Sequence, residues 1–83
     1  MNVHKWLEAN PHISQVELAR LVTSHTGASV NPSAVSHWAT GRTEPAPKNA
    51  HALRAISLIM RKSKKASGVM ILGDIAPKTF ASA

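Results

Sequence analysis

Two helix-start signals in the first half of the chain constrain its fold more than any other feature. In "ISQVEL", Ser14 is a favourable N-cap and Glu17 stands three residues later, which is the pattern of a capping box, with apolar neighbours placed as a hydrophobic staple. In "VNPSAV", Asn31 is a favourable N-cap and Pro32 falls at the first helical position, where its missing N–H costs nothing. One helix therefore starts near residue 15 and another near residue 32.

Prolines, glycines and caps predict the other helix boundaries. Asn2 caps a first helix, and Pro11 prevents that helix from continuing. Gly27 and Gly41 are suited to end the second and third helices, and Pro47 can open a fourth. The sequence thus predicts a mainly all-α fold of four to five helices with a short extended C-terminal segment. The expected helices cover residues 3–9, 15–25, 32–40 and 47–65.

Apolar residues at helical spacing assign a buried face to each predicted helix. We expect both tryptophans to lie in the core. The fourth helix has a broad apolar face, which suits a central or dimer-forming helix. The predicted buried positions are Val3, Trp6 and Leu7; Leu18, Leu21 and Val22, with His25 on the same stripe; Ala34, Val35, Trp38 and Ala39; and Ala50, Leu53, Ile56, Ile59 and Met60.

The opposite face of the helix expected at 32–40 is polar, small and uncharged. Ser33, Ser36, His37 and Thr40 share it at i, i+3, i+4 and i+7. A merely solvated helix usually carries Lys and Glu, whereas small hydrogen-bonding side chains suit close approach to the edges of DNA bases. We therefore interpret this face as one that reads bases, and the alternative is an ordinary exposed face.

Positive charge favours a polyanionic partner. Ten Lys and Arg against four Asp and Glu give a net charge of +6. Four of the positive residues lie in "RKSKK", from Arg61 to Lys65. Such a balance is typical of nucleic-acid binders, although small basic proteins also bind acidic proteins or membranes. The cluster either contacts phosphates or complements the dipole at a helix C-terminus.

Composition argues against an enzyme and against a cofactor or metal. The absence of cysteine excludes disulfides and thiolate metal sites, and the five histidines lack metal-ligand spacing. The chain contains no nucleophile–base constellation and no glycine-rich phosphate loop. Without a signal pattern or an apolar run long enough for a membrane span, we expect a soluble cytoplasmic protein that has no membrane partner.

The segments "QVELA" and "VNPSAVSHWATGR" together resemble the helix-turn-helix of the lambda repressor and Cro-like phage regulators. The resemblance covers about residues 13 to 60. It implies a lambda-repressor-like DNA-binding domain over residues 1–66 whose helix 32–40 enters the major groove of double-stranded DNA. It also implies a transcriptional regulator that works in a bacterial host's cytoplasm, at the nucleoid, and binds a near-palindromic operator as a homodimer.

The resemblance also implies roles for individual residues. Base contacts fall at the matched positions Pro32, Ser33, Ser36 and His37, with His37 and Ser33 expected to set sequence choice. Thr40 shares their face. Gln15 matches a phosphate clamp, and Arg42 matches a backbone contact, the alternative for Arg42 being a solvated charge. Asn31 could add a phosphate contact, although capping alone explains it. Lys5 and Lys48 are weaker candidates.

The joint between the second and third helices departs from the family pattern. It looks about six residues longer than the usual turn of 3–4 residues. We expect the second helix to extend to Ser24 or His25, with Gly27 redirecting the chain through a positive φ and a longer loop following. The alternative is that the loop begins at Thr23 and that His25 is exposed on it.

The C-terminal segment, residues 67–83, lies outside the resemblance. Val69 to Leu72 form an apolar run, Gly73-Asp74 is a turn signal, and Pro77 is expected to end the stretch after that turn. We expect the run to be extended and either to pack on the helices or to pair with its copy in a dimer. The last few residues are expected to be disordered.

Three alternatives to the regulator remain open from sequence. The first is an antitoxin that binds DNA and also traps a protein partner with its apolar tail. The second is a sequence-blind architectural protein, which the uncharged reading face argues against. The third is a module that makes only protein contacts.

Overall fold

The helices start where the capping residues predict. The Ser14 hydroxyl accepts a hydrogen bond from the Glu17 amide at 3.0 Å, and the Asn31 side-chain oxygen accepts one from the Ala34 amide at 2.9 Å. Each bond satisfies an amide that has no partner inside the first helical turn. Asn2 caps the first helix in the same way. All three predicted starts are therefore confirmed.

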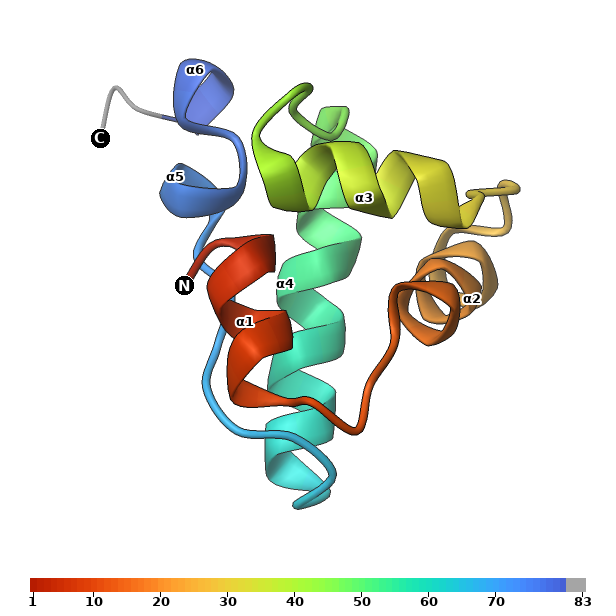
Figure 1. Cartoon of the computed structure of the whole chain (residues 1–83), viewed down its shortest axis with the longest axis vertical. Helices are drawn as coiled ribbons and strands as arrows, with labels where there is room; N and C mark the ends of the chain where they lie inside the picture. The colour runs from red at the N-terminus through yellow and green to blue at the C-terminus, as the bar shows by residue number, and fades with distance from the viewer. Residues whose placement is uncertain (81–83) are drawn as a thin grey trace.

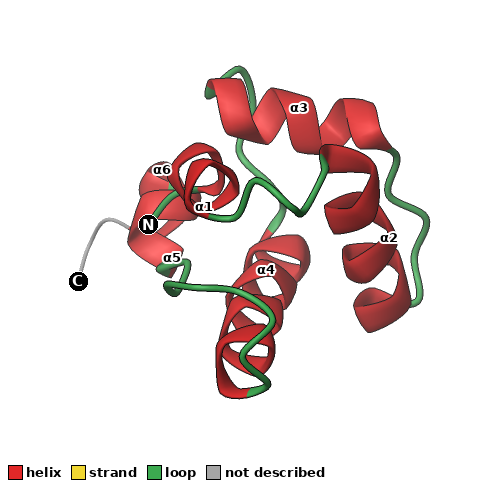
Figure 2. Cartoon of the chain, turned by 60° about the horizontal axis from the view of Figure 1, so that its bottom comes forward, coloured by secondary structure: helices red, strands yellow, loops and turns green. Residues whose placement is uncertain are grey.

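The computed structural model describes residues 1–80, which form six helices and no strand. The prediction of a small all-α fold is confirmed. α4 runs through the molecule with α2 on one side and α5 and α6 on the other, and α3 lies across its N-terminal end (Figure 1 and Figure 2). The helices are α1 (Val3–Ala9), α2 (Gln15–Thr26), α3 (Pro32–Thr40), α4 (Pro47–Lys62), α5 (Leu72–Ile75) and α6 (Pro77–Phe80).

One hydrophobic core joins these elements. Its large, fully buried side chains include Trp6 of α1, Leu18 of α2, Val35 of α3 and Leu53 of α4. Met70, from the segment that follows α4, is equally buried. α2 packs against both α3 and α4, and α1 packs against α3. The core therefore supports the side of α3 that carries Val35. None of the helices in residues 1–80 is long and apolar enough to cross a membrane.

α4 ends at Lys62, earlier than the predicted Lys65. Lys64 has a left-handed backbone, with a φ of 61°. The amides of Lys64 and Lys65 bond back to the carbonyls of Arg61 and Met60 at 3.1 and 2.8 Å. This pair of bonds is the Schellman arrangement, which usually places glycine at the left-handed position. This helix end was not predicted from the sequence, because a lysine rather than a glycine occupies the left-handed position.

The C-terminal segment is extended only up to Ile71 and then forms two single-turn helices. The predicted turn at Gly73-Asp74 is wrong, because both residues lie inside α5. The predicted end before Pro77 is observed, because α5 stops at Ile75 and Ala76 leaves the helical conformation, but Pro77 then begins a further helix, α6. Ile75 and Ala76 are buried between these positions. Their packing against the core outweighs the local preference of Gly-Asp for a turn.

The Val69–Leu72 run packs on the helices of its own chain, which is one of the two predicted arrangements. It forms no strand within the part of the chain that the structure describes. The residues predicted to be disordered at the end of the chain fall at 81–83, outside the described residues.

Two buried polar side chains hold the C-terminal segment against the helices. The Asn10 amide group donates to the carbonyls of Trp6 and Ser67 at 2.7 and 3.0 Å, and its oxygen accepts from the Ser67 amide at 2.7 Å. The Ser57 hydroxyl accepts from the Met70 amide at 2.9 Å. Neither contact was predicted, because Asn10 looked like part of a chain break and Ser57 lay beside an apolar stripe.

Several residues predicted to face the core are more exposed than expected. His25 is exposed although it lies within α2, and Ile59 is 56% exposed. Six others are only half-buried: Leu7, Leu21, Ala34, Trp38, Ala39 and Met60. His25 and Ile59 border a groove between α2 and α4, and Trp38 borders a hollow between α3 and the C-terminal segment. Helices that cross at an angle make contact over a limited length, so apolar residues beyond the crossing stay open.

Candidate nucleic-acid interface

The joint between α2 and α3 turns at Gly27. α2 reaches Thr26, just beyond the predicted end, and Gly27 then adopts a φ of 77°. Its amide donates to the Thr23 carbonyl at 2.8 Å. Because the left-handed region favours glycine, the predicted redirection at this residue is confirmed. The alternative, in which the loop starts at Thr23, is wrong, although its exposed His25 is observed.

Two threonines that the sequence analysis missed close this joint. The Thr23 hydroxyl accepts from the Val30 amide at 2.9 Å and donates to the Val30 carbonyl at 3.2 Å. The Thr26 hydroxyl accepts from the Ala28 amide at 3.2 Å. These bonds supply the loop backbone with partners that a longer connection would otherwise lack. The available signal was the tendency of threonine hydroxyls to bond nearby backbone groups.

α3 has one buried side and one open side. Val35 is fully buried, and Ala34 and Ala39 are half-buried. On the predicted reading face, Ser33 and Thr40 are exposed, but Ser36 and His37 are half-buried. Asn31 and Pro32 are exposed at the helix start. The polar face is therefore most exposed at the two ends of α3 and less exposed in its middle.

The polar side chains on this face differ in whether they already form hydrogen bonds within the chain. The Asn31 oxygen caps α3, and the Thr40 hydroxyl donates to the carbonyls of Ser36 and His37 at 3.1 and 3.3 Å. In contrast, no hydrogen bond within residues 1–80 engages the side chains of Ser33, Ser36 or His37. Ser33 and His37 are one helical turn apart, so they form a pair of free polar groups on α3.

The remaining predicted site residues lie around α3. Arg42 is exposed just after α3, and its amide donates to the His37 carbonyl at 2.9 Å, so it stays next to the last turn of the helix. Gln15 is exposed at the first residue of α2, a helix that packs against α3. Lys5 and Lys48 are exposed on α1 and at the start of α4, outside the α2–α3 pair.

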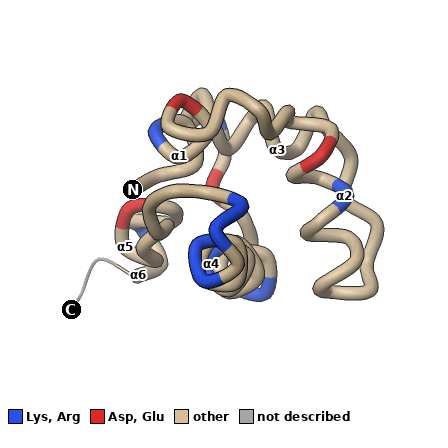
Figure 3. The backbone as a smooth tube through the Cα atoms, turned by 90° about the horizontal axis from the view of Figure 1, so that it is seen from below, with Lys and Arg blue, Asp and Glu red and all other residues tan. Residues whose placement is uncertain are grey.

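The basic cluster, defined as Arg61, Lys62, Lys64 and Lys65, lies away from α3. α3 leads into the N-terminal end of α4, whereas the cluster is at the C-terminal end (Figure 1). α4 has 16 residues, which corresponds to a length of about 24 Å. Figure 3 shows the Lys and Arg gathered at that end of α4, and α3 itself carries no charged residue. The cluster and the reading face therefore belong to different surfaces.

Comparison with family models, curated proteins and solved structures finds no match for this chain. The resemblance to lambda repressor and Cro-like regulators thus remains a prediction from the quoted motifs. In residues 1–80, no group of three or more His, Asp or Glu side chains is placed to hold a metal ion.

Proposed function

We propose that this chain is a sequence-specific, DNA-binding transcriptional regulator of the Cro or repressor type. It would bind a near-palindromic operator as a homodimer, with α3 in the major groove, and act in a bacterial cytoplasm. The observation that carries the proposal is the open face of α3. That face presents uncharged polar groups, three of which, on Ser33, Ser36 and His37, have no partner in the described structure.

The chemistry of that face suits base edges. The imidazole of His37 can donate to the N7 or O6 of guanine, and the Ser33 hydroxyl can donate or accept. Pro32 can contact a thymine methyl group but cannot form a hydrogen bond through its side chain. Thr40 is a weaker reader than its position on the face suggests, because its hydroxyl is already bonded to the α3 backbone.

Two predicted phosphate contacts flank the same surface. Gln15 stands at the N-terminus of α2, where backbone amides and the helix dipole favour an anion. Arg42 supplies a positive charge directly after α3. In this arrangement Gln15 and Arg42 position the duplex, and His37 and Ser33 select its sequence.

The test is a titration of labelled DNA fragments from the protein's own locus at two salt concentrations, against a random fragment of equal length. We expect tighter binding to one locus fragment and affinity that falls steeply with salt. His37→Ala should reduce the preference for that fragment, whereas Arg42→Ala should weaken binding to all DNA alike. Equal binding to locus and random fragments would rule out a specific regulator.

A further inference from the structure

A groove between the C-terminal halves of α2 and α4 leaves apolar side chains open to solvent. Its residues are half-buried or exposed, apart from the buried Ile56, and Ile59 is 56% exposed. Large apolar side chains gathered in an exposed groove mark interaction sites, whereas isolated ones need no explanation. The groove is lined by Leu21, Ser24, His25, Ile56, Ile59 and Met60.

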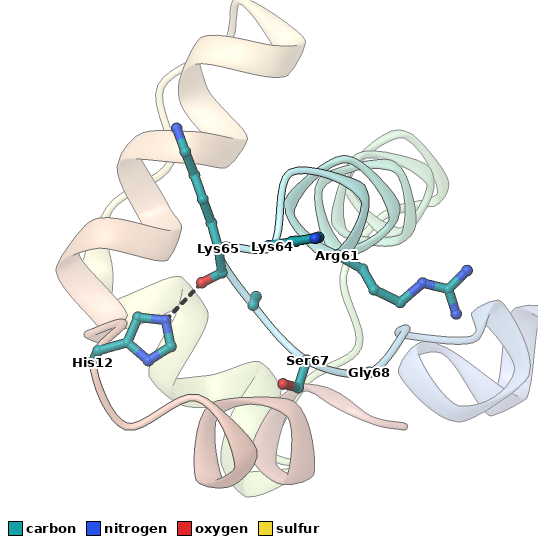
Figure 4. Close-up of a pocket in the computed structure, with 7 residues that line it drawn as sticks. His12, Arg61, Lys64, Lys65, Ser67 and Gly68 are labelled. Carbon is teal, nitrogen blue, oxygen red and sulfur yellow. Dashed lines mark hydrogen bonds between the residues drawn. The ribbon is translucent and has the colours of Figure 1, made fainter.

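Two lysines lie next to residues that line this groove, at the C-terminal end of α4. Lys62 follows Ile59 by one helical turn on α4. Lys65 returns to Met60, whose carbonyl accepts a bond from the Lys65 amide at 2.8 Å. Figure 4 shows the neighbouring hollow, which Arg61, Lys64 and Lys65 line; there the Lys65 side chain points toward α2, whereas the Arg61 side chain points away from it. The groove is therefore apolar along its floor and positive at this end.

A second copy of the chain fits this surface poorly. A second copy would present the same apolar floor and the same positive charge, and the lining of the groove supplies no carboxylate to pair with Lys62 and Lys65 of the other copy. Like charges at close range repel. Glu17 lies in the first turn of α2, outside the half of the helix that lines the groove, and pairs with Arg20 at 3.5 Å. The other side-chain carboxylates, of Glu8, Glu44 and Asp74, lie outside α2 and α4.

A nucleic-acid strand also fits poorly. Its phosphates would match Lys62 and Lys65 but would leave Ile59 and Met60 against a charged backbone. The C-terminal segment is not an alternative docking element, because Met70, Ile75 and Ala76 are buried in the core. A segment with an apolar stripe and carboxylates beside it matches both the floor of the groove and its positive end.

We propose that this groove, with Lys62 and Lys65, binds an acidic amphipathic helix of a protein partner. Helices dock in such grooves through apolar residues at i, i+3, i+4 and i+7. Carboxylates beside the stripe would meet the two lysines, which favours one orientation and faster association. The groove's charged end lies at the opposite end of α4 from α3 (Figure 1), so the proposed site does not include the polar face of α3.

The first experiment uses two synthetic peptides of identical composition and about four helical turns. One places leucines at i, i+3, i+4 and i+7 with glutamates beside them, and the other carries the same residues without a stripe. Fluorescence anisotropy of each labelled peptide with the full chain should show about tenfold tighter binding of the striped one. Equal binding would mean that only net charge attracts the peptides, and would overturn the proposal.

The second experiment locates the site with matched variants. Ile59→Ala should weaken binding of the striped peptide about fivefold or more, as truncation of an interface anchor does. Lys65→Glu should weaken it strongly, and Arg61→Glu, which makes the same charge change on the other side of α4, should have little effect. All three positions are exposed, so unfolding midpoints should stay close to that of the parent. Equal losses from Lys65→Glu and Arg61→Glu would overturn the proposal.

Two further outcomes would assign the surface to another occupant. Self-association measured by sedimentation, and abolished by Ile59→Ala, would identify a second copy. Competition by duplex DNA in samples where Ile59→Ala has no effect would identify a nucleic acid. His37→Ala should leave peptide binding unchanged, so failure of the DNA proposal and failure of this one are distinguishable.

Discussion

The α2–α3 pair and the C-terminal segment are held by different kinds of hydrogen bond. In the α2–α3 pair, Asn31 bonds to an amide three residues along the chain, and Thr23 bonds to a residue seven positions away. In the C-terminal segment, Asn10 bonds to a residue 57 positions away, and Ser57 to one 13 positions away. The first set is exposed or partly buried, whereas Asn10 and Ser57 are buried.

This difference predicts unequal effects on stability. When an exposed capping bond is lost, water satisfies the freed amide, and the cost is modest. When a buried side chain is removed, the backbone groups it served lose their partners and have no water to replace them. The long-range contacts should therefore contribute more to the free energy of unfolding than the caps that define the helices.

The largest expected effect is that of Asn10→Ala. Asn10 serves three backbone groups, so its removal should lower the free energy of unfolding by about 3 kcal/mol, measured by urea denaturation. The control is His12→Ala, because His12 contacts the Lys65 carbonyl at 2.7 Å from an exposed position. That variant should lose less than about 0.5 kcal/mol. Similar losses in both variants would contradict the importance of burial.

Ser57→Ala should have the second largest effect. It leaves the buried Met70 amide without its partner, which should cost about 2 kcal/mol. Ser63→Ala is the matched control, because the Ser63 hydroxyl donates to the Ile59 carbonyl from an exposed position next to the same helix. We expect the control to unfold at nearly the parent's urea midpoint. A larger loss in the control would reverse the proposed ranking.

Asn31→Ala tests the contribution of the short-range hydrogen bonds in the α2–α3 pair. Loss of the cap should lower the free energy of unfolding by about 1 kcal/mol. Asn31→Asp keeps the capping oxygen and places a negative charge at a helix N-terminus, so it should retain or slightly exceed the parent's stability. Thermal unfolding of both variants distinguishes the cap from other effects of position 31. Equal destabilisation by Ala and Asp would show that the cap is not responsible.

The smallest effect should be a gain. Lys64 has a φ of 61°, which costs energy for a residue with a Cβ atom, so Lys64→Gly should stabilise the chain by about 0.5 kcal/mol. Lys64→Ala removes the same charge but keeps the Cβ atom, and should not stabilise. Lys65→Gly, at a residue without positive φ, should destabilise. Urea unfolding that ranks Lys65→Gly above Lys64→Gly would contradict the role of the left-handed position.

For the candidate interface, the sequence predicted which residues share the polar face of α3 better than it predicted how exposed each of them is. Ser33, Ser36, His37 and Thr40 do lie opposite the buried Val35, because side-chain direction on a helix follows from residue spacing. The half-burial of Ser36 and His37 was not predicted, since it depends on the side chains that pack beside α3. The hydrogen bonds of the Thr40 hydroxyl to the α3 backbone depend on the rotamer of its side chain, which residue spacing does not specify.

By itself, the sequence determined the helix starts at 15 and 32, the left-handed turn at Gly27, and which residues of each helix share a face. These features depend on bonds and side-chain directions within a few residues, so a local pattern is enough to predict them. Only the tertiary structure decided the burial of Asn10 and Ser57, the helical form of residues 72–80, and the separation of the basic cluster from α3. Those depend on contacts between residues far apart in the chain, where packing outweighs local preference.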